Sequence, residues 1–239
     1  IRKPDVTGLS EESRGLMDST HYALPLQPAR FLWAHIKATI TSPIKYYSTF
    51  FMLMTMRGES FSNRRRTFFH FMEAINLLSS AQKAGIGQIH AHFSVNAATV
   101  ALVFSRMLGI SFSFTVHNNF FTDRIVLREK LNKARFIVAI SEFSKQYLLD
   151  LFPDDDIADK FQIVHCGVSP EKFNQANPPE TDRPLIYSVS QVVERKGYPY
   201  LIEACKILKE RGCKFRCQIA GDGPELGLLK ELIGKYNLQ

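Results

Sequence analysis

The chain has 239 residues, of which 45% are hydrophobic and 12% aromatic, and its formal net charge is +7. This composition is sufficient for one large or two modest packed domains and excludes an intrinsically disordered chain. The surplus of positive charge favours anionic partners such as phosphates, nucleic acid or acidic lipid headgroups, without distinguishing among them.

The cysteine and hydropathy patterns exclude several further classes. The four cysteines, at positions 166, 205, 213 and 217, form no CxxC pair, so no zinc or thioredoxin-type site is predicted, and they fit a reducing cytosol. The chain shows no secretory signal and no apolar run of the length that spans a bilayer. It begins with Ile1 rather than Met and stops in a helical pattern, so we expect a piece of a longer protein.

Residues 24–85 are rich in aromatic side chains and predict helices, with a break at Pro43. Basic and aromatic residues are interleaved in this segment: Arg57, Arg64, Arg65 and Arg66 lie among Phe51, Phe61, Phe68, Phe69 and Phe71. Such interleaving suits a membrane interface or anionic lipid. The alternative is that these helices pack against a core and expose only a basic face to water, as many helices of soluble proteins do.

From about Gln88 the pattern alternates between strands and helices. Strands are expected at 88–94, 111–117, 136–141, 160–167, 184–190 and 214–221, and helices at 96–109, 122–134, 141–152, 198–212 and 224–237. Gly109 and Gly212 are expected to end helices, and Ser141 is expected to cap one. The polar, proline-bearing segment 174–184 has no periodicity and is interpreted as a linker between domains.

Strand–helix alternation on both sides of a linker predicts two parallel-sheet α/β domains. The first domain is assigned to residues 1–173, incomplete at its start, the linker to 174–184, and the beginning of a second domain to 185–239. Parallel sheets of this kind bind ligands beyond the carboxyl ends of their strands. Candidate site residues are therefore sought in the loops that follow strands.

Two loops of the second domain carry such residues. In the stretch IAGDGPE, Gly221 and Gly223 allow close approach of a ligand, and the helix start that follows favours an anion. In the stretch SVSQVVERKG, Lys196 and Arg195 can supply charge to a phosphate, and Glu194 can accept a hydrogen bond from a sugar or orient Lys196. Two such loops at one sheet edge favour a diphosphate site over two ordinary turns.

Three histidines lie at strands of the first domain. His117 ends one strand, where an imidazole can donate to a sugar hydroxyl or carbonyl; the alternative is a histidine that is merely packed or solvated. His90 and His92 share a strand face, because side chains two residues apart point the same way. A metal pair is disfavoured, since no third ligand stands at suitable spacing. We expect one of the pair, His92, to line a cleft and the other to be packed.

Six stretches in this order resemble glycosyltransferase family 4, whose members are retaining, nucleotide-sugar-dependent enzymes of the GT-B fold. The likeness covers residues 87–239 and is strongest to bacterial enzymes of exopolysaccharide, colanic-acid or lipopolysaccharide synthesis. The stretches that carry it are HAHF, SFSFTVH, AISEFSKQYL, KFQIVHCGVSPEKF, SVSQVVERKGYPYLIEAC and IAGDGPE. The resemblance implies two Rossmann-like domains that face a cleft.

The resemblance also implies roles for particular residues. Lys196 matches the lysine that grips the donor diphosphate, and Gly221 and Gly223 match the glycines beside it. His117 matches the histidine that contacts the donor sugar near the reacting carbon, and Gly167 matches a glycine of the crossover near the domain boundary. The family needs no metal and no cofactor, because basic side chains and helix starts stabilise the departing diphosphate.

The chain departs from the family pattern at several positions. Gln191 stands where members usually carry an arginine, and the loss of that charge could cost about 1.5–3 kcal/mol of phosphate binding unless Arg195 compensates. Ser190 replaces a usual glycine, and Phe120 replaces an aspartate that often follows the site histidine. Ser169 replaces the aspartate of a common GVD motif.

The function implied is transfer of a hexose from a UDP- or GDP-sugar to a glycan or lipid-linked acceptor, in cell-surface polysaccharide synthesis. We expect the protein in the cytoplasm, at the inner face of the membrane, with peripheral contact to anionic lipid. Two alternatives stay open: a non-catalytic relative that acts as scaffold in a glycan assembly complex, favoured by Gln191 and Phe120, and a sugar-nucleotide epimerase or phosphorylase on the same fold. Nucleic acid is not an expected partner, because no recognition motif accompanies the basic residues.

Overall fold

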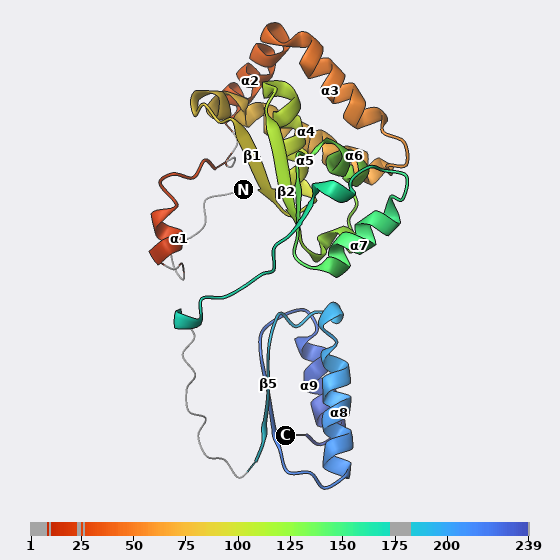
Figure 1. Cartoon of the computed structure of the whole chain (residues 1–239). Coiled ribbons are helices and arrows are strands. Elements are labelled where there is room, and N and C mark those ends of the chain that lie inside the picture. Colours follow the sequence, from red (N-terminus) through yellow and green to blue (C-terminus); the bar gives the residue numbers. More distant parts are fainter. Residues whose placement is uncertain (1–8, 10, 23–24, 26, 173–182, 239) are drawn as a thin grey trace. The chain divides into compact units, whose positions relative to one another are not determined.

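The computed structural model describes residues 9, 11–22, 25, 27–172 and 183–238. These residues divide into two compact units, a first unit of residues 1–168 and a second unit of residues 169–239 (Figure 1). Most of the predicted linker 174–184 lies outside the described residues, so its assignment stays a prediction. The expected boundaries at 173 and 185 likewise stay predictions.

The first unit contains a four-stranded parallel sheet with the strand order β1-β2-β3-β4. Its strands are β1 (Gln88–His92), β2 (Ser111–Val116), β3 (Ile137–Ala139) and β4 (Phe161–Ile163). Three helices connect them: α5 (Asn96–Leu108), α6 (Leu127–Lys133) and α7 (Glu142–Leu151). The predicted alternation of parallel strands and helices is therefore confirmed in this unit.

Two of the predicted helix ends are formed by the expected residues. Gly109 ends α5 with a left-handed φ of +73°, and its N–H donates to the Ser105 carbonyl at 2.9 Å. The Ser141 hydroxyl accepts from the Ser144 N–H at 3.2 Å and so caps α7. Both helix ends could be predicted from the sequence because each depends on the residue type at the helix end rather than on distant contacts.

The start of α6 differs from the prediction. The sequence favoured a helix over 122–134, but the helix begins at Leu127 and is preceded by a single 3-10 turn at Asn118–Phe121. Val126 has a left-handed φ of +51°, and its N–H donates to the Glu59 carboxylate at 2.6 Å. A contact with a side chain 67 residues away thus holds the backbone out of the helical conformation just before the helix.

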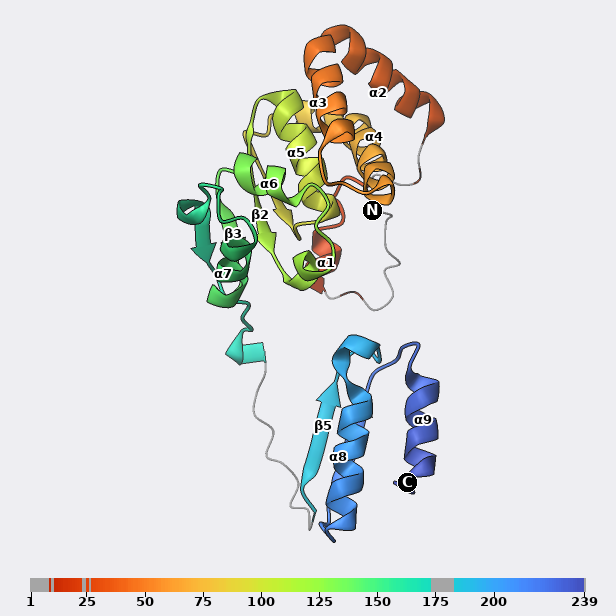
Figure 2. The same ribbon diagram turned by 90° about the vertical axis from the view of Figure 1, so that its right-hand side faces the viewer.

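A layer of three helices precedes the sheet in sequence: α2 (Pro28–Thr41), α3 (Pro43–Thr55) and α4 (Phe61–Lys83), after a single turn α1 (Glu11–Gly15). The predicted break at Pro43 is confirmed, since Pro43 is the first residue of α3. Helix α5 packs on β1 and β2, α3 and α4 pack on α5, and α2 packs on α3 and α4 (Figure 2).

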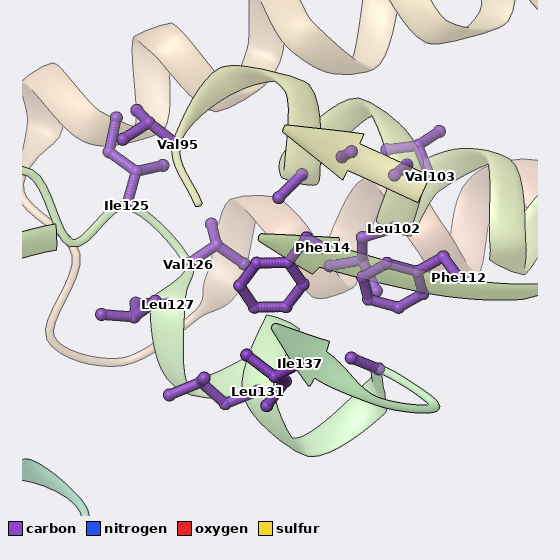
Figure 3. Close-up of a cluster of buried hydrophobic side chains, with 14 of the residues drawn as sticks. Val95, Leu102, Val103, Phe112, Phe114, Ile125, Val126, Leu127, Leu131 and Ile137 are labelled. Atoms are coloured by element: carbon purple, nitrogen blue, oxygen red, sulfur yellow. The ribbon is translucent and has the colours of Figure 1, made fainter. Parts of the chain in front are cut away.

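The core of the first unit lies between the sheet and these helices. Phe112 and Phe114 point to the same side of β2 and their rings stack at a centroid distance of 6.3 Å, beside Ile137 of β3 (Figure 3). Leu102 of α5 and Leu131 of α6 close over them. Burial of such side chains stabilises the unit by roughly 1.5–3 kcal/mol each relative to exposure.

The second unit is smaller and contains two parallel strands, β5 (Leu185–Val189) and β6 (Arg216–Ala220). Helix α8 (Tyr198–Glu210) connects them, α9 (Leu226–Lys235) follows β6, and a 3-10 turn η4 (Glu194–Lys196) precedes α8. A 3-10 turn also occurs at Pro170–Lys172 in this unit, and another at Ala158–Lys160 in the first unit. The core of the second unit is formed by Val192, Tyr198, Ile202 and Leu229.

A lysine is completely buried in the first unit. Lys130 of α6 donates to the main-chain carbonyls of Ser94 at 2.6 Å and Val95 at 2.9 Å. Burial lowers the pKa of the Lys130 amine to about 7, and the nearby carboxylates of Asp123 and Glu59 oppose this shift only in part. A neutral amine has two N–H groups, so it can donate one hydrogen bond to each of these two carbonyls.

This burial predicts that stability rises with pH above neutrality. Between pH 7 and about 10.5 the unfolded chain keeps a proton on Lys130 that the folded chain has released, so raising the pH favours the folded state. We expect urea unfolding to give a free energy about 1–2 kcal/mol higher at pH 9 than at pH 7, and this gain to be absent in Lys130→Met. An equal gain in the variant would show that other groups produce it.

Candidate functional site

The two glycine- and lysine-bearing loops of the second unit meet at one edge of its sheet. The Ser190 N–H donates to the Ala220 carbonyl at 3.2 Å, and the Val192 N–H donates to the Asp222 carbonyl at 2.9 Å. In return the Glu225 N–H donates to the Val192 carbonyl at 3.2 Å. The prediction that both loops open on the same edge is therefore confirmed, and main-chain hydrogen bonds fix their separation.

Close approach of the two backbones explains why glycines stand at 221 and 223. A Cβ atom added to Gly221 would lie 1.9 Å from the Ser190 carbonyl oxygen, and one added to Gly223 would lie 2.2 Å from the Val192 carbonyl oxygen. Neither glycine has a positive φ, so space rather than backbone conformation requires glycine at these positions. The Gly223 N–H donates to the Asp222 carboxylate at 2.8 Å, a bond that a phosphate oxygen would have to replace.

The charged residues of the other loop are exposed on the 3-10 turn η4. Glu194, Arg195 and Lys196 form this turn, and Gly197 ends it with a φ of +67°, just before α8. Gln191 is also exposed, three residues before the turn. Because α8 begins directly after this glycine, the charged side chains lie at the carboxyl edge of the sheet, where the sequence placed them.

Tyr198, which sequence reasoning did not single out, holds this loop in place through hydrogen bonds. Its hydroxyl is within 2.8 Å of the Ser190 hydroxyl and 3.2 Å of the Ser188 hydroxyl. The hydrogen bonds to Ser188 and Ser190, together with the positive charge of Lys196, lower the pKa of Tyr198. Ser190, an apparent departure from the family pattern, therefore ties the end of β5 to the start of α8.

A pocket of about 450 Å³ lies beside the turn η4, and it also was not predicted. It is lined by Glu194, Arg195, Gly197, Pro199, Tyr200 and Glu225. One carboxylate oxygen of Glu225 is buried there, and no hydrogen-bond partner for it occurs among the described residues. Two carboxylates and one guanidinium suit the hydroxyl groups of a sugar better than a phosphate, because carboxylates accept hydrogen bonds and repel anions.

In the first unit, two of the three histidines lie together at the carboxyl ends of β1 and β2. The rings of His92 and His117 are stacked at a centroid distance of 6.1 Å, and the ring of Phe93 lies 4.7 Å from His117. Phe93 has a left-handed φ of +74°, which is strained for an aromatic residue. This strain could not be predicted from residue type, because phenylalanine is not a residue typical of positive φ.

His90 lies next to His92, with a distance of 5.4 Å between their ring centroids. Its two ring nitrogens lie 2.8 Å from the Ser113 hydroxyl and 2.9 Å from the Thr115 hydroxyl, and its ring stacks on Phe136. Burial, and then the charge of His92, lower the pKa of His90, so its neutral form is favoured. His90 and His92 are both exposed and line one pocket of the first unit, so the expectation that one of the pair is packed is wrong, whereas the expectation that His92 lines a cavity is met. Within the described ranges no three His, Cys, Asp or Glu side chains lie close enough to hold a metal.

The remaining candidates in the first unit lie apart from this cluster. Gly167 is exposed next to the boundary of the unit, with no atom near its hypothetical Cβ, and its role stays a prediction. Phe120 is completely buried, with its ring 4.3 Å from Phe121 and 5.8 Å from Tyr147. The position where related sequences often carry an aspartate is thus a core position here.

Two family models match adjacent parts of the chain. Residues 54–172 match the family described as Glycosyltransferase Family 4, and residues 169–239 match the family described as Glycosyl transferases group 1. The junction of the two matches falls within a few residues of the boundary between the two structural units, at residue 168. Each unit therefore corresponds to one of the two matched families.

Curated relatives match shorter stretches. The amylovoran biosynthesis glycosyltransferase AmsK of Erwinia amylovora is 39% identical over 83 residues, which is 34% of this chain and 20% of the relative. The alpha-D-kanosaminyltransferase of Streptomyces kanamyceticus is 41% identical over 58 residues, which is 24% of this chain and 15% of the relative. The matched stretch is thus about a fifth of the length of these relatives or less.

Solved structures show the fold. A mutant of Staphylococcus aureus TarM, in complex with fondaparinux, alpha-GlcNAc-glycerol and UDP, has a TM-score of 0.52 at 14% identity and covers 70% of this chain and 35% of that one. The catalytic domain of starch synthase IV from Arabidopsis thaliana, bound to ADP and acarbose, has a TM-score of 0.50 at 16% identity and covers 74% and 50% of the two chains. The predicted α/β fold of GT-B type is confirmed.

The loop contact predicts that Gly223→Ala destabilises the second unit. The added methyl group would overlap the Val192 carbonyl, so the two loops would have to separate. We expect a loss of roughly 1–3 kcal/mol in urea unfolding, as for overpacked sites. Gly227→Ala, in α9 and with no atom near its Cβ, is the matched control and should be neutral or stabilising. Equal effects of the two changes would contradict this account.

Proposed function

Because the chain belongs to glycosyltransferase family 4, we propose that the protein transfers a sugar from a nucleotide-sugar donor to a glycan or lipid-linked acceptor in polysaccharide biosynthesis. The observation that carries this proposal is the joined pair of loops in the second unit. There a glycine turn held against a neighbouring backbone adjoins a loop with two exposed cations. This combination of close backbone approach and positive charge suits a diphosphate.

The second unit supplies the donor side of the proposed reaction. Lys196 offers a point charge to a phosphate oxygen, and Arg195 adds a second cation on the same turn. Gly221 and Gly223 let their turn lie directly against the backbone of Ser190 and Val192, in the loop that carries Lys196. The pocket lined by Glu194 and Glu225 then accepts hydroxyl groups of the donor.

The reaction exchanges one bond for another at the anomeric carbon. The bond from this carbon to the phosphate oxygen breaks, the nucleoside diphosphate leaves with the bonding electrons, and an acceptor hydroxyl forms the new glycosidic bond as its proton passes to the leaving diphosphate. We propose that the anomeric configuration is retained, as in the family. Lys196 and Arg195 stabilise the charge that develops on the leaving diphosphate, and no resident metal or other cofactor takes part.

In the first unit we assign His117 to contact the sugar that is transferred. Its ring lies at the end of β2, packed against His92 and Phe93, so its orientation is fixed by aromatic contacts. The strained, half-exposed Phe93 keeps an apolar surface next to this imidazole. We propose further that the donor is a UDP- or GDP-sugar and that the protein acts in the cytoplasm at the inner face of the membrane.

A donor panel tests the reaction. The protein, expressed from its whole reading frame, is incubated with UDP-, GDP- and ADP-sugars and a lipid-linked acceptor extract, and release of nucleoside diphosphate is measured with and without EDTA. We expect release from one donor, unchanged by EDTA. In Lys196→Ala kcat/KM should fall roughly 10- to 100-fold, because a charged hydrogen bond to phosphate is lost.

Lys214→Ala is the matched control for this variant. Lys214 is exposed in the same unit but precedes β6, at the opposite edge of the sheet, so its removal should leave release unchanged. If a folded protein neither binds nor cleaves any donor, the transferase proposal fails and a scaffold role in a glycan assembly complex takes its place. Release that stops in EDTA would overturn the metal-independent step alone.

A substitution at Gln191 is expected to have the opposite effect to Lys196→Ala. Its exposed amide sits near the turn η4 without a charge, so Gln191→Arg should strengthen the grip on the diphosphate. We expect the donor KM to fall by about tenfold, with kcat little changed. Gln218→Arg, which adds the same charge on β6 at an exposed position, is the control for net charge. A lower activity in Gln191→Arg would indicate that the amide itself makes a specific contact.

A further inference from the structure

The positive charge of the chain is concentrated in the outer helices of the first unit. Residues 27–72 contain a single acidic residue, Glu59, and seven basic ones: Arg30, Lys37, Lys45, Arg57, Arg64, Arg65 and Arg66. This segment therefore carries a net charge of +6 out of the total of +7. None of the helices α2, α3 and α4 has an acidic residue in its first turn.

Helix α2 is apolar on two opposite faces. Ala34, His35 and Ala38 are buried on the side that packs on α3 and α4. On the opposite side Trp33 is 64% exposed and Ile40 is 73% exposed, with Leu32 and Ile36 beside them. At 100° per residue these four side chains share one helix face. Such a face, directed away from the core, is not explained by packing within the described residues.

Helix α3 also has an exposed apolar side. Its buried side holds Thr49 and Leu53, whereas Ile44 is 84% exposed and Phe51 is 58% exposed, with Tyr47 between them. We call the side chains of Trp33, Ile36, Ile40, Ile44, Tyr47 and Phe51 the α2–α3 face. It lies on the outer helices of the first unit, beyond α5 (Figure 2).

We propose that the α2–α3 face docks on a bilayer surface that contains anionic lipid. Tryptophan, tyrosine and phenylalanine side chains partition to the headgroup boundary, and interleaved lysines and arginines are attracted to acidic headgroups. Lys37, Lys45 and Arg57 are exposed on or next to these helices. No helix in the described ranges has the length and apolar content needed to cross a bilayer.

Charge favours a membrane over a second copy of the chain as the occupant. Two copies joined through this face would bring Lys37, Lys45 and Arg57 of each copy together, at a cost from like-charge repulsion. A bilayer with acidic headgroups instead supplies the opposite charge. This proposal rests on the membrane location proposed above and identifies the surface that makes the contact. Its test uses no donor, so a negative result would not contradict the proposed transferase reaction.

Trp33 makes the test direct, because it is the only tryptophan of the chain. The protein is titrated with vesicles of phosphatidylcholine alone and of phosphatidylcholine mixed with phosphatidylglycerol, and tryptophan emission is recorded. With the anionic vesicles we expect a shift to shorter wavelength and quenching by brominated lipid, both reversed by high salt. Neutral vesicles should give little change.

Two double variants separate the apolar and the electrostatic contributions. Ile40→Glu with Phe51→Glu keeps Trp33 as the reporter and should weaken partitioning by roughly tenfold or more. Lys37→Gln with Arg57→Gln should weaken it by about fivefold for each removed charge. Phe143→Glu, at a position on α7 that is 68% exposed, and Lys214→Gln are the matched controls and should bind as the unchanged protein does. Thermal unfolding verifies that each variant is folded.

Two results would overturn the proposal. Equal binding to neutral and anionic vesicles, or binding that neither double variant alters, would exclude this face as the lipid contact. A shift of Trp33 emission that appears without vesicles, rises with protein concentration and accompanies dimers in sedimentation would assign the face to a second copy of the chain.

Discussion

Parallel pairing of the strands is the constraint on which the rest of this structure depends. A parallel strand must return through a helix, so the loops that leave the carboxyl ends of neighbouring strands gather at one sheet edge. In the first unit this brings His92 and His117 together from β1 and β2. In the second unit it brings the turn of Lys196 next to the glycines that follow β6. Residues far apart in sequence become candidates for one site through topology alone.

Topology sets the edge, but separate interactions set the shape of each loop. In the second unit two backbones come into direct contact, and glycine is required because any side chain would overlap a carbonyl. In the first unit the loop after Phe93 is held instead by the buried amine of Lys130, which donates hydrogen bonds to the carbonyls of Ser94 and Val95. Rigid loops reduce the entropy that ligand binding must overcome. Both units therefore fix a loop with hydrogen bonds directed to its main chain.

The predictability of each feature follows from how local its cause is. Strands, helices, the Ser141 cap and the Gly109 end were predicted because periodicity and end residues act within a few positions. The start of α6 and the burial of Lys130 were not, since they depend on Glu59 and on the carbonyls of Ser94 and Val95. Glu225 was missed for the same reason, because its pocket forms only where two loops adjoin. Tyr198 was missed because its partners Ser188 and Ser190 meet it only once the connection between β5 and α8 is folded.

The outer helices show why the two readings of a basic, aromatic segment are not exclusive. Packing against a core and exposure of apolar side chains are both present on α2, on opposite faces of one helix. The core-facing side accounts for why the helix forms, because isolated helices of this length are marginal in water. It does not account for Trp33 and Ile40, whose exposure has no benefit in water alone. A surface that offers apolar depth and negative charge together satisfies both the exposed apolar side chains and the exposed Lys37, Lys45 and Arg57 on or next to these helices.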